Sequence, residues 1–367
     1  MRILADKYLH ALDRLISDDF ALTTYDPDLG FPDSATEYDV LLIRTVTKIN
    51  PETLPKAGNI KFVGSATAGF DHVDVEHLRN LGIEFARSEG CNANAVAEYV
   101  LTVLYRWGQM RDVNVEDLKI GVVGCGNTGG SLIGYLEKVG IDFVPYDPPK
   151  AERENDFISA DLHELLKCDI LSFHTPLTNS GPHPTYHLCN KGWLKNKFKL
   201  IVNSSRGGVV DEHALMNAKN ANLVSDFVLD VWENEPVFSD KSASQAFIAT
   251  PHIAGYSREA KWMASEIVVR KMHEFFGKTY LPPVQNEKPV EVDLAGPEGV
   301  TFADFLWKNH KIDHYDEKLR NLIGLPDKEK ARKFADLRSN TETRFEFRTI
   351  IEQYTNSNKL PDQVKIF

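Results

Sequence analysis

Three glycines with the spacing Gly-x-Gly-x-x-Gly restrict what this chain can fold into more than any other feature of its sequence. They are Gly124, Gly126 and Gly129, and they follow the apolar run IGVV and precede a segment with helical spacing. In such a turn the first glycine allows a tight bend, the second lets a phosphate approach the backbone, and the third lets the helix pack against the strand. Free N–H groups at the helix start bind the anion. The sequence therefore predicts a phosphate-binding turn in a parallel sheet, although a glycine-rich turn taken alone could be purely structural.

An acidic residue, Asp147, ends the next expected strand, 18 residues after Gly129. In a dinucleotide-binding sheet, an acid at this place accepts hydrogen bonds from the ribose hydroxyls and repels a 2′-phosphate. Turn and acid together indicate a dinucleotide site and favour NAD over NADP. Lys150 and Arg153 oppose this preference, because a basic residue in the same loop could accommodate the additional phosphate.

Continuous apolar runs alternate with amphipathic segments, which is typical of parallel strands covered by helices on both faces. Strands are expected over residues 2–5, 40–43 and 61–64, and a second series ends at residues 124, 147, 174, 205, 232 and 251. Long helices are expected over 92–106 and 257–276. We therefore predict an α/β fold with two Rossmann-like, doubly wound parallel-sheet domains.

A chain of 367 residues exceeds what one hydrophobic core usually supports. The predicted domains are a discontinuous substrate domain (1–92 and 263–284), a dinucleotide-binding domain (93–262) and a C-terminal domain (285–367). After Pro282 and Pro283 the chain becomes rich in charge and poor in strand signals, with helices expected near 316–322 and 327–338. We expect these helices and a few strands to form a small α+β domain.

Charge and cysteine content exclude several classes of function. The net charge of −11 disfavours non-specific binding to nucleic acid or to an anionic membrane. The four cysteines are far apart and do not have the spacing of a zinc site. The first residues lack a signal peptide's apolar region, and no segment approaches the roughly 20 apolar residues of a membrane span. The sequence predicts a cytoplasmic protein without a metal, a nucleic-acid partner or a membrane partner.

Three charged side chains follow the last three expected strands. Arg206, Glu235 and His252 come after the strands that end at residues 205, 232 and 251. Because ligands bind outside the carboxyl ends of parallel strands, we expect the three loops to converge. Oxidation of a secondary alcohol needs a base, which imidazole supplies, and a carboxylate can orient that imidazole. A guanidinium can bind a substrate carboxylate by paired hydrogen bonds. The set predicts hydride transfer at C2 of a 2-hydroxy acid.

Each of these side chains has another interpretation. His252 could be a core histidine, Arg206 part of a surface ion pair, and Glu235 merely the acid of a turn. Glu233 competes for the carboxylate role, and only the spacing E-x-E-P favours Glu235. His174 is expected to have a structural or cofactor-loop role.

These motifs resemble those of the D-isomer-specific 2-hydroxyacid dehydrogenases. The resemblance rests on GCGNTG with Asp147, SSRGGVVDEHAL, LDVWENEP and TPHIAGYS, and it extends to about residue 280. It implies NAD as the cofactor, with its carboxamide near Asp230, and Arg206, Glu235 and His252 as catalytic residues. The residues implied to bind the cofactor are Gly124, Gly126, Asn127, Thr128, Gly129, Asp147, Thr175, Ser204, Ser205, Asp230 and Gly255.

Three N-terminal segments, LLIRTVTKIN, KFVGSATAGFDHVD and SEGCNANAVAEYV, resemble family members whose substrate carries a phosphate. Arg44 and Lys48 lie in one loop after an expected strand and are predicted to bind that phosphate, although Lys48 could equally be a solvated lysine. Thr45, Thr47, Thr67 and Tyr256 are further predicted substrate contacts. The C-terminal extension resembles a dimerisation domain of this family, which implies a homodimer.

Two other functions fit the same sequence. One is a family member that acts on glycerate or 3-phosphoglycerate. The other is a nicotinamide-sensing scaffold with little turnover, against which the intact set of Arg206, Glu235 and His252 argues.

Overall fold

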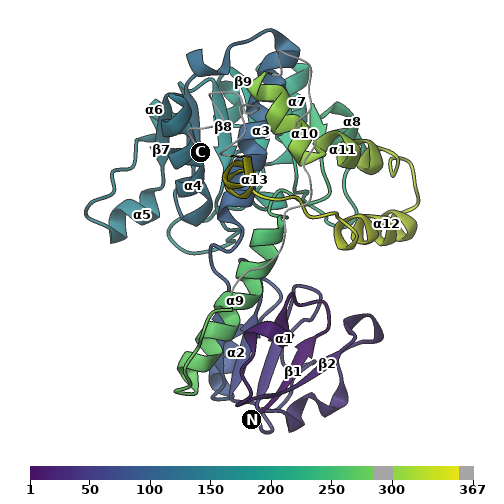
Figure 1. The fold of residues 1–367 in the computed structure, drawn as a ribbon. Coiled ribbons are helices and arrows are strands. Elements are labelled where there is room, and N and C mark those ends of the chain that lie inside the picture. Colours follow the sequence, from purple (N-terminus) through teal and green to yellow (C-terminus); the bar gives the residue numbers. More distant parts are fainter. Residues whose placement is uncertain (284–300, 355–367) are drawn as a thin grey trace. The chain divides into compact units, whose positions relative to one another are not determined.

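The computed structural model describes residues 1–283 and 301–354 of the chain (Figure 1). These residues form two compact units. Unit 1 contains residues 1–92 and the helix that begins at Arg258, and unit 2 contains residues 93–257 and 301–354. Each unit is built on its own parallel sheet, so the predicted α/β fold with two Rossmann-like sheets is confirmed.

Unit 1 has a five-stranded sheet in the order β2-β1-β3-β4-β5. Its elements are β1 (Arg2–Asp6), α1 (Leu12–Leu15), β2 (Ala21–Tyr25), β3 (Val40–Ile43), β4 (Phe62–Ser65), α2 (Val75–Asn80), β5 (Glu84–Arg87) and α9 (Arg258–Phe275). All neighbouring strands are parallel; Ile3 of β1, for example, lies opposite Val40 of β3. The order reverses between β1 and β3, which is where sheets of this type bind ligands.

Unit 2 has a six-stranded parallel sheet in the order β11-β10-β9-β8-β6-β7. Its strands are β6 (Ile120–Val123), β7 (Phe143–Tyr146), β8 (Ile170–Phe173), β9 (Phe198–Asn203), β10 (Val224–Leu229) and β11 (Ile248–Ala249). Its helices are α3 (Ala93–Arg111), α4 (Asn127–Val139), α5 (Pro148–Arg153), α6 (Leu162–Leu165), α7 (Glu212–Asn220), α8 (Asp240–Gln245), α10 (Phe302–His310), α11 (Ile312–Arg320), α12 (Asp327–Ser339) and α13 (Phe347–Tyr354). The order of the strands reverses between β6 and β8, so the glycine turn after β6 lies at the reversal.

Both faces of each sheet are buried, which explains the continuous apolar runs of the strands. In unit 1, Ile3 of β1 lies in one core and Leu4 in the opposite one. Helix α9 packs closely against β4. A Cβ atom added to Gly64 of β4 would lie only 2.2 Å from Val268 Cγ2 of α9, so the close packing requires glycine at this position. In unit 2, Ile120 and Val123 of β6 likewise face different cores.

The C-terminal helices α10–α13 belong to the cores of unit 2. Phe305 and Phe347 pack in the core that contains α3, whereas Leu319 and Phe334 pack in the core on the other face of the sheet. The predicted strands are wrong for residues 301–354, which contain four helices and one isolated bridge between Arg344 and Ser257. Apolar residues at helical spacing bury one face of each helix against unit 2, and no second sheet is needed to cover them. Residue 284 of the predicted substrate domain and residues 285–300 and 355–367 of the predicted C-terminal domain lie outside the described residues.

Across the described residues, no helix combines the length and apolar character that a membrane span requires.

Candidate active site

The glycine turn of unit 2 connects β6 to α4. Gly124 has φ +86°, and a Cβ atom on Gly129 would lie 1.9 Å from Gly124 O, so both positions exclude larger residues. Nothing lies within 4 Å of a Cβ atom built on Gly126, which leaves its backbone accessible. Helix α4 begins without a side-chain cap, so its first N–H groups, near Asn127 and Thr128, can bind an anion.

Asp147 follows β7 and stabilises the glycine turn by hydrogen bonding. Its Oδ2 accepts a hydrogen bond from Cys125 N at 2.8 Å, and its Oδ1 caps α5 by accepting from Lys150 N at 3.0 Å. Lys150 Nζ donates to Cys125 O at 2.9 Å. Each carboxylate oxygen can accept a further hydrogen bond, so Asp147 can also receive a ribose hydroxyl.

Three buried polar atoms at the ends of β8 and β9 have no hydrogen-bond partner in the described structure. They are His174 Nδ1, Thr175 Oγ1 and Ser204 Oγ. Burial lowers the pKa of His174 to about 3, so its ring is neutral, and Nε2 lies 2.9 Å from Ser172 Oγ. Buried polar atoms without partners are costly, and a polar ligand satisfies them. Together with the glycine turn, they fit a dinucleotide at the carboxyl edge of this sheet.

His252 and Glu235 form a hydrogen-bonded pair beyond β10 and β11. His252 Nδ1 lies 2.8 Å from Glu235 Oε2, and Glu235 Oε1 accepts from Trp232 N at 2.9 Å. Burial alone would raise the pKa of Glu235, but His252, Arg338 and the Trp232 N–H together lower it. The carboxylate therefore stays charged and orients the imidazole through Nδ1, which leaves Nε2 available to exchange a proton with a ligand.

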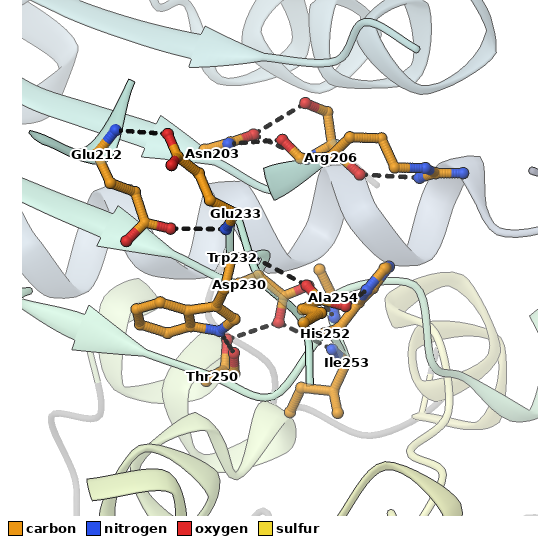
Figure 2. Close-up of polar contacts among 12 residues, drawn as sticks. Asn203, Arg206, Glu212, Asp230, Trp232, Glu233, Thr250, His252, Ile253 and Ala254 are labelled. Carbon is orange, nitrogen blue, oxygen red and sulfur yellow. Dashed lines mark hydrogen bonds and ion pairs between the residues drawn. The ribbon is translucent and has the colours of Figure 1, made fainter. Parts of the chain in front are cut away.

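Asp230 fixes the loop that carries His252 (Figure 2). Its carboxylate is buried and accepts from Thr250 Oγ1 at 2.6 Å, Ile253 N at 2.8 Å and Ala254 N at 2.9 Å. Its main-chain oxygen accepts from His252 N at 2.7 Å, which holds His252 at φ +58°. Burial raises the pKa of Asp230 despite these hydrogen bonds. Gly255 and Tyr256 lie in the same loop.

Arg206 lies in the loop after β9, and Ser205 and Asn203 shape that loop. Ser205 Oγ donates to Asn203 Oδ1 at 2.8 Å, and Arg206 Nη1 donates to Ser205 O at 2.8 Å. A Cβ atom on Gly207 would lie 1.8 Å from Trp232 O. The loops that carry Arg206 and Glu235 are therefore in direct backbone contact, and the expected convergence of the three strand ends is present in unit 2.

The structure distinguishes the two candidate carboxylates. Glu233 points to His187, with its Oε1 2.9 Å from His187 Nε2, whereas Glu235 contacts His252. The sequence did not single out His187 or Arg338, since both reach the site from distant segments. Arg338 lies in α12, within the C-terminal extension that resembles a dimerisation domain, so no sequence signal linked it to this site.

The predicted phosphate ligands lie in unit 1, after β3. Arg44 Nε donates to the buried Asp6 Oδ2 at 2.9 Å, at the point where the strand order reverses. Partial burial and the nearby Arg44 lower the pKa of Lys261 in α9, a cation that the sequence did not single out.

The other predicted contacts in unit 1 differ in accessibility. Thr45 and Lys48 are exposed, but Thr47 is buried with its Oγ1 2.7 Å from Tyr25 OH, so that hydroxyl lies in the core. Thr67 Oγ1 donates to Gly69 O at 2.7 Å.

Comparisons with known proteins agree with this geometry. Residues 94–254 match the family model described as D-isomer specific 2-hydroxyacid dehydrogenase, NAD binding domain. The chain is 39% identical to erythronate-4-phosphate dehydrogenase of Teredinibacter turnerae, covering 88% of each chain, and 37% identical to the Legionella pneumophila (strain Lens) protein of that name, covering 80% of this chain and 83% of the relative. D-lactate dehydrogenase of Aquifex aeolicus, solved with NAD and lactic acid, superposes with a TM-score of 0.58 at 23% identity, covering 76% of this chain and 96% of that one.

Proposed function

The chain belongs to the D-isomer-specific 2-hydroxyacid dehydrogenases, which makes it an NAD-dependent oxidoreductase, and we propose that it oxidises 4-phospho-D-erythronate at C2. The product is 2-oxo-3-hydroxy-4-phosphobutanoate, in the biosynthesis of pyridoxal 5′-phosphate. Relatives that cover most of the chain carry the name of this activity, which supports the substrate. The observation that carries the proposal is the His252–Glu235 pair, because the loop of Glu235 contacts the loop of Arg206 in the unit that has the glycine turn.

Each of the three side chains has one proposed role. Arg206 binds the substrate carboxylate and polarises the C2 oxygen. His252 Nε2 takes the proton of the C2 hydroxyl, while Glu235 holds Nδ1–H and stabilises the imidazolium that forms. NAD, when bound, accepts the hydride that leaves C2. In the reverse direction His252 returns the proton to the same oxygen.

The proposed cofactor ligands are the residues that the sequence predicts on unit 2. The turn from Gly124 to Gly129 would bind the pyrophosphate, Asp147 the ribose, and Thr175 and Ser204 would use their buried hydroxyls. On unit 1, Arg44 and Lys48 would bind the substrate phosphate. Thr45, Thr67 and Tyr256 remain proposed substrate contacts, whereas the buried Thr47 would act through the position of its loop.

A substrate panel tests this function. Purified protein is incubated with NAD and 4-phosphoerythronate, glycerate, 3-phosphoglycerate or D-lactate, and NADH formation is followed by absorbance. We expect kcat/KM to be highest for 4-phosphoerythronate. A higher value for either glycerate compound would assign the chain to another member of the family, and NAD binding without turnover of any acid would indicate a sensing scaffold.

A cytoplasmic homodimer is part of the same proposal. The resemblance of the C-terminal extension to a dimerisation domain supports the dimer. Light scattering coupled to size-exclusion chromatography measures the mass in solution, and we expect twice the 41.4 kDa of one chain.

A further inference from the structure

A second histidine–carboxylate pair lies in unit 2, and the proposed mechanism does not use it. His187 Nε2 lies 2.9 Å from Glu233 Oε1, and Nδ1 lies 3.8 Å from Asp211 Oδ2. Glu233 is only two residues from Glu235. Both ring nitrogens of His187 therefore face carboxylate oxygens, and one of these carboxylates, Glu233, lies in the same loop as Glu235, the partner of His252.

The main chain of His187 is bound to the loop that carries Arg206. Its N–H donates to Gly208 O at 2.7 Å, and Cys189 N donates to Val209 O at 3.1 Å. These bonds hold His187 at φ +50°, in the left-handed region that few residues other than glycine adopt. The Tyr186 ring stacks on the imidazole at 4.0 Å. The position of His187 is therefore coupled to that of the Arg206 loop.

The side chain of Glu233 is bound from two directions. Besides His187, the N–H of Glu212 donates to its Oε1 at 3.0 Å. In return the N–H of Glu233 donates to Glu212 Oε1 at 2.8 Å, and Figure 2 shows this reciprocal pair. Glu212 is buried at the first residue of α7, so the loop before Glu235 is anchored to a rigid helix.

We propose that His187 is a positioning residue that holds the Arg206 loop and the Glu235 loop in a fixed relation. Its main chain binds one loop and its ring binds the other, through Glu233. The two loops are already in backbone contact at Gly207 and Trp232, so small displacements of one are transmitted to the other. The inference rests on the roles proposed above for Arg206, Glu235 and His252.

The test compares His187→Ala and His187→Gln with a matched control. His183 also forms a histidine–glutamate pair, with Nε2 2.9 Å from Glu152 Oε1, but Glu152 belongs to α5 and to neither loop. We expect His187→Ala to lower kcat about 10-fold while NAD affinity stays within about twofold, because misplaced catalytic groups slow chemistry more than binding. His187→Gln keeps an N–H donor toward Glu233 and should restore most of kcat. His183→Ala should behave as wild type.

The pH profile separates positioning from a general effect on folding. In His187→Ala, the pH profile of kcat/KM should differ from that of the wild type, because the Glu235 carboxylate is held less firmly against His252. A double-mutant cycle with Glu233→Ala should be non-additive. An unchanged profile with a loss of activity that follows only the loss of thermal stability would overturn the inference.

Failure of the proposed function gives a different result. If His252→Ala is inactive and His187→Ala matches wild type, only the positioning role is wrong. If His252→Ala itself turns over normally, the proposed function is wrong.

Discussion

His252 Nδ1 lies 2.8 Å from Glu235 Oε2, and this hydrogen bond joins two loops that are 17 residues apart in the sequence. Additional hydrogen bonds to the main chain fix the loop of each partner. Asp230 accepts from the main chain just beyond His252, and Glu235 accepts from Trp232 N. The imidazole is thus oriented by its surroundings before a substrate binds, which limits the reorganisation that proton transfer requires.

The first prediction concerns His252. We expect His252→Ala to lower kcat by roughly 100-fold or more, the usual scale for loss of a general base, and to leave NAD affinity nearly unchanged. Initial rates of NADH formation and NAD titration of protein fluorescence measure the two quantities. His213→Ala, at an exposed position on α7, is the control. Wild-type turnover by His252→Ala would remove His252 from the chemistry.

The second prediction compares two glycines of α4. A Cβ atom on Gly129 would lie 1.9 Å from Gly124 O, whereas nothing lies within 4 Å of one on Gly134. Gly129→Ala should weaken NAD binding at least about 10-fold, because the turn and the helix must separate. Gly134→Ala should keep NAD affinity and raise the free energy of unfolding by about 0.5–1 kcal/mol. Equal NAD affinities for both variants would contradict the assignment of the turn.

The third prediction concerns the substrate phosphate. We expect Arg44→Ala and Lys48→Ala to raise KM for 4-phosphoerythronate about 10-fold each, with a smaller effect on kcat, since a charged hydrogen bond is lost in both the ground and transition states. Lys56→Ala, an exposed lysine near the same loop, should have no effect. Unchanged kcat/KM in both variants would place the phosphate site elsewhere.

The fourth prediction is a pH dependence of stability. Burial raises the pKa of Glu98, in α3, from 4.5 to about 7, against the opposing effect of Arg344. Between these two pH values the folded protein binds a proton that the unfolded chain releases, so the contribution of Glu98 to stability falls as pH rises. The slope is at most about 1.4 kcal/mol per pH unit.

Thermal unfolding of wild type and Glu98→Gln between pH 5 and pH 8 tests this prediction. The Tm of the wild type should fall relative to that of Glu98→Gln as the pH rises from 5 to 7. A constant difference in Tm over this range would show that Glu98 is ionised in the folded protein throughout.

The strand positions could be predicted because a strand buried on both faces needs a continuous apolar run. Strands β2 (ALTTY) and β5 (EFAR) could not be predicted from such a run, because they are edge strands with exposed polar residues. The C-terminal strands were wrongly expected because a charged segment was taken as a separate domain, when its apolar residues complete the cores of unit 2.

The positions of Arg206 and His252 just beyond strand ends could be predicted, because the buried strands before them are recognisable in the sequence. Spacing alone could not separate Glu233 from Glu235, because both lie in an irregular loop whose side-chain directions follow no period. The partners of that loop are distant in sequence: His187 lies 46 residues from Glu233, and Arg338 comes from α12. Likewise, no local pattern shows that Thr47 turns inward to Tyr25.

Both units are discontinuous in sequence, and this sets the order in which a nascent chain can complete them. The sheet of unit 1 is synthesised first, but the face that packs on Val268 and Met272 stays uncovered until α9 has left the ribosome. The core of unit 2 that contains α3 is complete only after Phe305 and Phe347 have been synthesised. A ribosome that stalls before α9 would therefore present two unfinished cores at once, and chaperones that bind exposed apolar surface would encounter this protein late in its synthesis.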